Sequence, residues 1–368
     1  MRICRMWLGL MWVLALASEM AFGISLCSYR TPAISLVDAD LSFAYQFFDD
    51  ANTAAIDVST GRIDASFTRL RDTESFGFVA RLNAQVGLTN FRASSWLGEG
   101  ETSFRYYVST ELPLFGFGGV YGIAATGQTQ LGLEIRSGFG FGRFYDVTPL
   151  AKAMTIHRNL RLSKAVKAPL PDTVLQEIAR TIGRLAEFDA VTDAVAAIET
   201  SIETASGAQL DARSLLMIED VLAEAGSERY CGWSAQAGVG YELLDPYGGA
   251  QGFLVAMSSD LAFAPDPSGQ IEGHVSFSGP FDLMNENTLT GSFSYEIQLT
   301  NTSDLEVACS FQRVKPAGLT AVTSHMLSGK LLFEVGTADV LLNLNVSRRT
   351  GDAGWSVGFS ISTAMDLL

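Results

Sequence analysis

The sequence predicts an all-β membrane barrel of about 14 antiparallel strands (roughly 12 to 16) that carries an inserted small α-helical domain. Three observations lead to this fold class. Apolar and polar residues alternate along most of the chain. Residues 146–226 instead repeat apolar residues at helical spacing. An export leader precedes both regions.

The alternation favours a membrane barrel over a soluble sheet. From Phe76 to Leu88 every even position is apolar, and the odd positions include Arg81 and Asn83. A soluble, secreted β protein would use its apolar face as a core, whereas a barrel turns that face to lipid. The alternating segments are about 10 to 14 residues long, which exceeds the usual soluble strand and suits a tilted membrane span. Their polar faces are often Gly or Ser, as expected where side chains crowd a closed interior.

The expected strands and their connections give the barrel an orientation. The strands are expected at about 37–48, 54–68, 76–90, 102–112, 115–125, 129–144, 231–243, 251–263, 271–281, 289–300, 303–314, 326–335, 339–348 and 354–364. Membrane barrels have short turns on the periplasmic side and long loops outside. The longer connections, such as Asn90–Glu101 and Val314–His325, fall on one side. The shorter ones, such as Thr300–Ser303, fall on the other side, and the helical insert falls with them.

The chain therefore divides into four regions. Residues 1–23 are interpreted as a signal peptide, with Arg2 and Arg5 before an apolar run of 12 residues, too short for the roughly 20 of a membrane helix. Residues 24–145 and 227–368 form the two parts of the barrel. Residues 146–226 form the helical insert, which we expect in the periplasm. This insert is either a simple folded loop domain or a module that docks a partner or plugs the lumen.

The insert should contain four amphipathic helices packed as a bundle. Thr148 and Pro149 are a suitable N-cap and first-turn pair for the first helix. Asp172 begins the second helix, and the third ends near Gly207. Asp211 can cap the fourth. Each helix carries one apolar stripe, so the helices should bury these stripes against one another.

The sequence shows no catalytic or metal-binding motif. There are three histidines, and HExxH, a phosphate loop, paired CxxC and GxSxG are all missing. Beyond the leader, Cys27, Cys231 and Cys309 have a spacing that fits no disulfide framework or zinc site. We therefore expect no metal, no cofactor, no catalytic residue and no enzymatic activity.

One pair of residues supports a minor enzymatic alternative. His274 and Ser276 alternate on one expected strand and share its polar face. They resemble the His-x-Ser pair that outer-membrane phospholipases place on a barrel strand. Asn285 and Asn287 match the third member of that site only loosely, and our register turns the pair inward. A lipid hydrolase is therefore a minor hypothesis beside a polar interior lining.

Parity along the strands predicts the residues that face the barrel interior. Both charge signs and several amides occur there, which fits either a hydrated pore or a salt-bridged network that closes it. The predicted pore-lining residues are Arg81, Asn83, Gln85, Arg105, Glu134, Arg136, Gln236, Glu242, Glu296, Gln298, Glu306, Asn343 and Asn345. The formal net charge of −15, from 25 Lys and Arg against 40 Asp and Glu, argues against nucleic-acid partners.

The mature chain resembles bacterial outer-membrane β-barrel, porin-like proteins in its general pattern. The pattern comprises the leader, the alternating segments, aromatics near segment ends such as Phe144 and Tyr241, and a final strand from Trp355 to Leu368. The chain departs from it by ending in Asp366-Leu367-Leu368 rather than in an aromatic residue. About fourteen strands also resembles the size of outer-membrane transporters of hydrophobic compounds.

This resemblance implies location and function. We expect the protein in the outer membrane of a Gram-negative-type bacterium after signal-peptide cleavage, in contact with outer-membrane lipid and passing small solutes passively. The alternative is a non-conducting structural envelope protein whose helical insert, 146–226, docks an envelope or periplasmic partner. The minor alternative is the lipid hydrolase.

Overall fold

The computed structural model describes residues 24–365, apart from 31–33, 49–57, 110–111, 224–227, 250, 301 and 336–337. Fourteen strands form one antiparallel sheet in which each strand pairs with its neighbours in the chain. The strands are β1 (Ile34–Phe48), β2 (Val58–Asp72), β3 (Phe76–Thr89), β4 (Arg92–Tyr107), β5 (Leu114–Ala125), β6 (Gly132–Asp146), β7 (Tyr230–Leu244), β8 (Phe253–Phe263), β9 (Gly269–Pro280), β10 (Asn287–Thr300), β11 (Ser303–Lys315), β12 (Val322–Val335), β13 (Ala338–Arg349) and β14 (Ser356–Met365).

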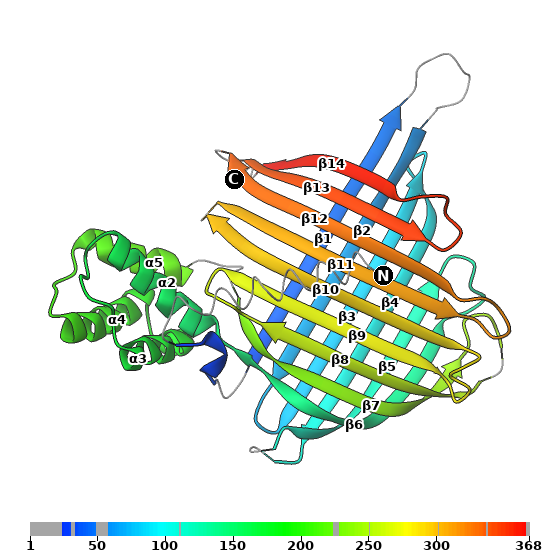
Figure 1. Cartoon of the computed structure of the whole chain (residues 1–368), viewed down its shortest axis with the longest axis horizontal. Helices are drawn as coiled ribbons and strands as arrows, with labels where there is room; N and C mark the ends of the chain where they lie inside the picture. The colour runs from blue at the N-terminus through cyan, green and yellow to red at the C-terminus, as the bar shows by residue number, and fades with distance from the viewer. Residues whose placement is uncertain are drawn as a thin grey trace.

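The sheet curls into a barrel, and a helical domain lies beyond one of its ends (Figure 1). This domain contains α2 (Thr148–Leu162), α3 (Asp172–Gly183), the 3-10 turn η2 (Leu185–Glu187), α4 (Val191–Ser206) and α5 (Ala212–Ala223). The predicted fold class, an all-β barrel of antiparallel strands with an inserted helical domain, is confirmed. The two edge strands are β1 and β14, and no ladder joins them within the residues that the structure describes.

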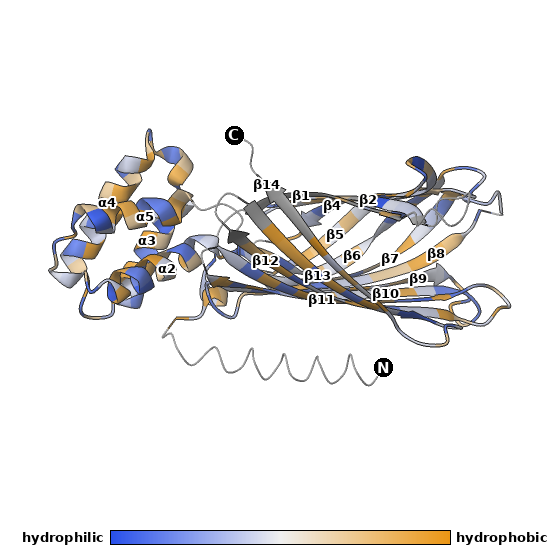
Figure 2. Ribbon diagram, turned by 90° about the horizontal axis from the view of Figure 1, so that it is seen from above, coloured by the Kyte–Doolittle hydropathy of each residue, from blue (hydrophilic) through white to orange (hydrophobic). Residues whose placement is uncertain are grey.

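Large apolar side chains point outward from the barrel wall. On β6, Ile135, Phe139 and Phe141 are exposed, while the intervening Gly138 and Gly140 face inward. Figure 2 shows hydrophobic residues recurring along the coloured strands of the barrel. In the part of the chain that the structure describes these side chains are exposed, so the outer face has the chemistry of a surface that meets lipid.

The connection between β3 and β4 differs from the expected loop. The sequence suggested a loop over Asn90–Glu101, but β4 begins at Arg92. Asn90 and Phe91 have φ angles of 52° and 58°, as in a two-residue hairpin turn with positive φ at both positions. The polar composition of the segment that follows concealed a strand that pairs with both β3 and β5.

Other connections agree with the expected asymmetry. At the helical-domain end, β10 ends at Thr300 and β11 already begins at Ser303. At the opposite end, six residues separate β9 from β10, and six separate β11 from β12. The predicted signal peptide, the start of the second strand at 54 and the terminal Asp366-Leu367-Leu368 all lie outside the described residues.

The helical domain has its own apolar core. The side chains of Leu150, Ile178, Ile198, Ile202 and Ile218 are fully buried there. These positions follow the apolar stripes of four different helices. Short helices are marginal alone, so burial of these stripes against one another stabilises the bundle. No helix among the described residues is long and apolar enough to cross a membrane.

The ends of these helices partly follow the sequence. Asp211 accepts a hydrogen bond from the Ser214 backbone N–H at 2.9 Å, as expected for the cap of α5. Gly207 ends α4 with a φ of 66°. The expected N-cap at Thr148 is wrong, because Thr148 is already the first residue of α2 and its N–H donates to the Asp146 carboxylate at 2.9 Å. Pro149 lies in the first turn, as expected.

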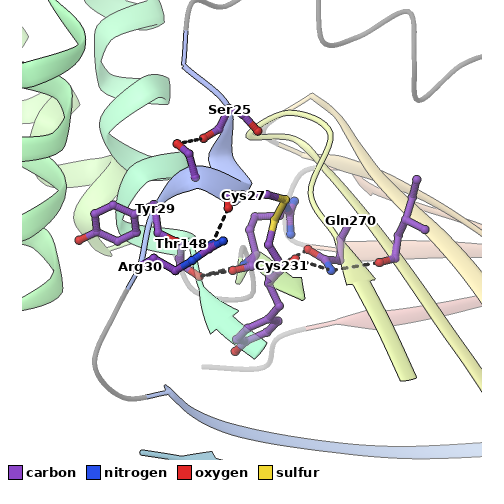
Figure 3. The surroundings of a disulfide bond; sticks show 11 residues. Ser25, Cys27, Tyr29, Arg30, Thr148, Cys231 and Gln270 are labelled. Atoms are coloured by element: carbon purple, nitrogen blue, oxygen red, sulfur yellow. Dashed lines mark hydrogen bonds between the residues drawn. A yellow bond between two sulfur atoms is a disulfide. The ribbon is translucent and has the colours of Figure 1, made fainter. Parts of the chain in front are cut away.

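A disulfide joins Cys27 to Cys231, with the Cα atoms 5.3 Å apart. Cys27 lies in the short 3-10 helix η1 (Leu26–Ser28), whose Leu26 packs into the helical-domain core, and Cys231 lies at the start of β7 (Figure 3). The expectation that the cysteines form no disulfide is therefore wrong. The two residues are 204 positions apart, so no local spacing could reveal the pair.

Candidate functional site

The barrel encloses a cavity of about 1000 Å³. Polar side chains from several strands around the barrel line it, including Ser103 of β4, Gln236 of β7, Ser258 of β8 and Ser292 of β10. Strand alternation places these side chains on the inner face, opposite the apolar outer face. The cavity is large enough for a small organic molecule or a cluster of water.

The structure brings seven of the thirteen predicted interior residues to this cavity. They are Arg81, Asn83, Arg105, Arg136, Gln236, Glu296 and Glu306. The other six, Gln85, Glu134, Glu242, Gln298, Asn343 and Asn345, do not line it. Glu134 and Glu242 are partners on β6 and β7, and Asn343 faces Lys330 across β12 and β13. That solutes pass these residues stays a prediction.

Asp260 lines the cavity and contacts four side chains among the described residues. Its carboxylate lies 3.3 Å from Arg81 Nη2, 4.0 Å from Arg105 Nη2 and 2.6 Å from His274 Nδ1. Ser234 Oγ also donates to it at 3.4 Å. Asp260 was not among the predicted interior residues. Its position between the outward-facing Ser259 and Leu261 on β8 could have predicted that it faces the interior.

His274 and Ser276 do not form a nucleophilic pair. His274 is bound to Asp260, whereas the Ser276 hydroxyl is within 2.5 Å of the Thr290 hydroxyl. Asn287 binds Leu283 O and Arg313 near the far end of β10. Asn285 accepts from the Gly318 N–H in a loop. Neither asparagine is bonded to His274 or Ser276 among the contacts of the described residues.

At its helical-domain end, the lumen is lined by both apolar and charged side chains. Leu70 of β2 packs against Phe144, Tyr230 and Ala262, which come from β6, β7 and β8. Arg229, 2% exposed, precedes β7 and lies 3.7 Å from Glu296. Its guanidinium also donates to the carbonyl oxygens of residues 267 and 268 at 3.2 Å each.

No group of three or more His, Cys, Asp or Glu side chains that could hold a metal ion occurs among the described residues. The Asp260 cluster instead combines one carboxylate with two guanidinium groups and an imidazole. Such a set suits electrostatic contact with a polar or charged solute rather than metal coordination.

No protein-family model and no curated protein sequence match the chain. Among solved structures, the chain is similar to one described as "CymD monoaromatic hydrocarbon channel". The identity is 9%, the similarity covers 92% of this chain and 88% of that chain, and the TM-score is 0.30. At these values the similarity decides nothing about the function of this chain.

Proposed function

We propose that the protein is an outer-membrane barrel that passes small solutes passively, in the manner of a porin. The observation that carries this proposal is a polar cavity of about 1000 Å³ inside a wall whose outer face is apolar. A lumen lined by polar groups offers a solute the hydrogen bonds that lipid cannot offer. The protein then provides a path for the solute and does not catalyse a reaction on it.

Two features support an outer-membrane location for the proposed channel. The disulfide between Cys27 and Cys231 requires an oxidising compartment, such as the bacterial periplasm. The short connection between Thr300 and Ser303 is at the same end as the helical domain. Because membrane barrels place short turns in the periplasm, we propose that the helical domain is periplasmic.

The direct test of transport is conductance of the purified full chain in planar bilayers, together with uptake of small neutral sugars by proteoliposomes. We expect discrete conductance steps and uptake that falls as the solute grows. The matched control is the same preparation boiled before reconstitution. Folded protein that gives neither conductance nor uptake would remove the transport proposal.

The second candidate function is a non-conducting structural barrel whose helical domain docks an envelope partner. The contact of Leu70 with the cluster of Phe144, Tyr230 and Ala262 favours it, because this contact narrows the lumen near the helical domain. Deletion of 149–226 separates the candidates. A docking protein would lose its envelope partner while the barrel still inserts, and a channel would keep its conductance.

A lipid-hydrolase role for His274 and Ser276 has less support. Ser276 shares its hydrogen bond with Thr290 rather than with His274, so no base is in place to activate the hydroxyl. We propose that the chain is not an enzyme. Lipase activity that is present in the purified protein and lost in Ser276→Ala would contradict this proposal.

A further inference from the structure

One ionic contact crosses the barrel lumen. Arg81 lies on β3 and Asp260 on β8, and five strand positions separate these two strands in the sheet. Neighbouring strands are about 4.8 Å apart, so the two residues are roughly 24 Å apart along the wall. Their charged groups are nevertheless 3.3 Å apart. The contact is therefore made across the interior, between facing walls.

Arg105 makes a second contact across the lumen, from the same side of the barrel as Arg81. It lies on β4, and its Nη2 atom is 4.0 Å from Asp260 Oδ2. Arg105 is 4% exposed and Asp260 is 8% exposed, so both charges are removed from bulk water. The Arg105 Nε atom has no hydrogen-bond partner among the described residues. Removal of either buried charge would therefore leave the other with neither its partner nor water.

An apolar layer lies next to this ionic layer. Ala262 is two residues beyond Asp260 on β8, toward the helical domain, and it belongs to the cluster with Leu70, Phe144 and Tyr230. Leu70 comes from β2 and the other three from β6 to β8, so this cluster also joins facing walls. The lumen is thus narrowed at two successive levels, first by charges and then by apolar side chains.

We propose that Asp260, with Arg81 and Arg105 facing it, forms the constriction that sets the charge selectivity of the channel. This inference rests on the proposed function and names the residues that decide which solutes pass. At this level cationic groups meet a carboxylate across the lumen, so a permeating ion passes close to both charge signs. In a narrow site of low dielectric constant, removal of one charge changes the energy of a passing ion far more than it does in water.

The test measures single-channel conductance and reversal potential in a KCl gradient, with the full chain in a planar bilayer. In Asp260→Asn, two arginines face no carboxylate, so the reversal potential should move toward chloride selectivity. In Arg81→Gln the crossing side chain is shorter and neutral, so the shift should be toward potassium. Asp260→Asn breaks both cross-lumen contacts and should raise the conductance about twofold or more, whereas Arg81→Gln breaks one of them and should raise it less.

Glu306→Gln is the matched comparator. Glu306 pairs with Lys330 at 2.9 Å, but these residues lie on the neighbouring strands β11 and β12. The substitution removes one lumen charge, as Asp260→Asn does, without breaking a contact between facing walls. It should produce less than about half of the selectivity shift that Asp260→Asn produces.

The outcomes separate this inference from the proposed function. A conducting wild type whose Asp260→Asn and Arg81→Gln variants behave like Glu306→Gln overturns the constriction and leaves the channel intact. A silent wild type with conducting variants supports the constriction and rejects the open channel. Silence in every folded variant rejects both. If Asp260→Asn fails to fold because Arg105 is left unpaired, Arg81→Gln, whose side chain is 33% exposed, decides the question.

Discussion

At the scale of single residues, buried polar side chains tie together segments that are distant in sequence. Arg229 holds the start of β7 to the β8–β9 connection through the carbonyl oxygens of residues 267 and 268. The disulfide of Cys27 holds the N-terminal segment to Cys231 on the same strand. The disulfide attaches the segment that packs in the helical-domain core to the barrel, so we expect its removal to loosen the domain before the barrel.

The disulfide gives the first prediction. Cys27→Ser with Cys231→Ser should destabilise the helical domain by about 2–4 kcal/mol, because the unfolded chain regains the freedom of a long loop. Thermal unfolding followed by circular dichroism at helical wavelengths measures the change. Cys309→Ser removes a thiol outside the disulfide and should have a smaller effect. Equal melting temperatures for the double variant and the wild type would contradict the prediction.

His157 gives a prediction about pH. Burial inside the helical domain lowers the pKa of His157, and the nearby Arg161 lowers it further. The stabilising contribution of the neutral ring is therefore complete above the unfolded pKa of about 6.5. It is lost as the pH falls below that value toward the folded pKa, because the unfolded state then binds the extra proton.

The measurement is the melting temperature of the helical signal between pH 8 and pH 5 in the full chain. The wild type should lose stability across this range, and His157→Gln should lose less. Because the melting temperatures at different pH values are compared within the same protein, the effect of the substitution itself on stability cancels. An identical pH dependence in both proteins would show that His157 does not carry the effect.

At the scale of elements, β6 and β7 meet through glycines. Gly138 lies directly opposite Gly238 in the ladder. A Cβ atom on Gly138 would overlap backbone atoms of Ala237 and Gly238. The small residues on this inner face thus allow a close approach of backbones, which is one established use of glycine in strands.

Gly138→Val should therefore destabilise the barrel by about 1–3 kcal/mol through overpacking. Gly118→Val on β5 is the matched control, because a Cβ atom there meets nothing within 4 Å. The fraction of folded barrel after refolding into detergent, followed against urea concentration, measures both variants. Equal midpoints for the two variants would show that the glycine contact is unimportant.

At the scale of the whole molecule, the barrel must leave no exposed strand edge in lipid. Unpaired N–H and C=O groups in the hydrocarbon region cost several kcal/mol each. The edge strands β1 and β14 share no ladder within the described residues. We therefore expect these two strands to pair when the protein is inserted in a bilayer.

Heat-modifiability on a denaturing gel tests this closure. A closed barrel resists the detergent until it is boiled, and then changes its mobility. We expect such a shift for protein extracted from membranes or refolded in lipid, and a boiled sample is the internal control. Unchanged mobility, with the protein in the soluble fraction, would contradict the membrane barrel. The apolar faces of the strands would then form the core of a soluble β protein.

The sequence by itself determined the class of fold and the face that each strand turns outward. A period of two residues is local information, so alternation from Phe76 to Leu88 was enough to orient β3. The apolar stripes of the helices were equally local. The same parity identified Arg81, Arg105 and Glu296, among others, as inward-facing residues that line the cavity.

Only the tertiary structure decided which of these residues meet. Arg81 and Asp260 are 179 positions apart, and their contact depends on how the wall curves, which no local pattern encodes. The pairing of Cys27 with Cys231 depends on where η1 packs. The start of β4 at Arg92 depends on the backbone of Asn90 and Phe91, whose positive φ angles are stabilised by strand pairing on both sides.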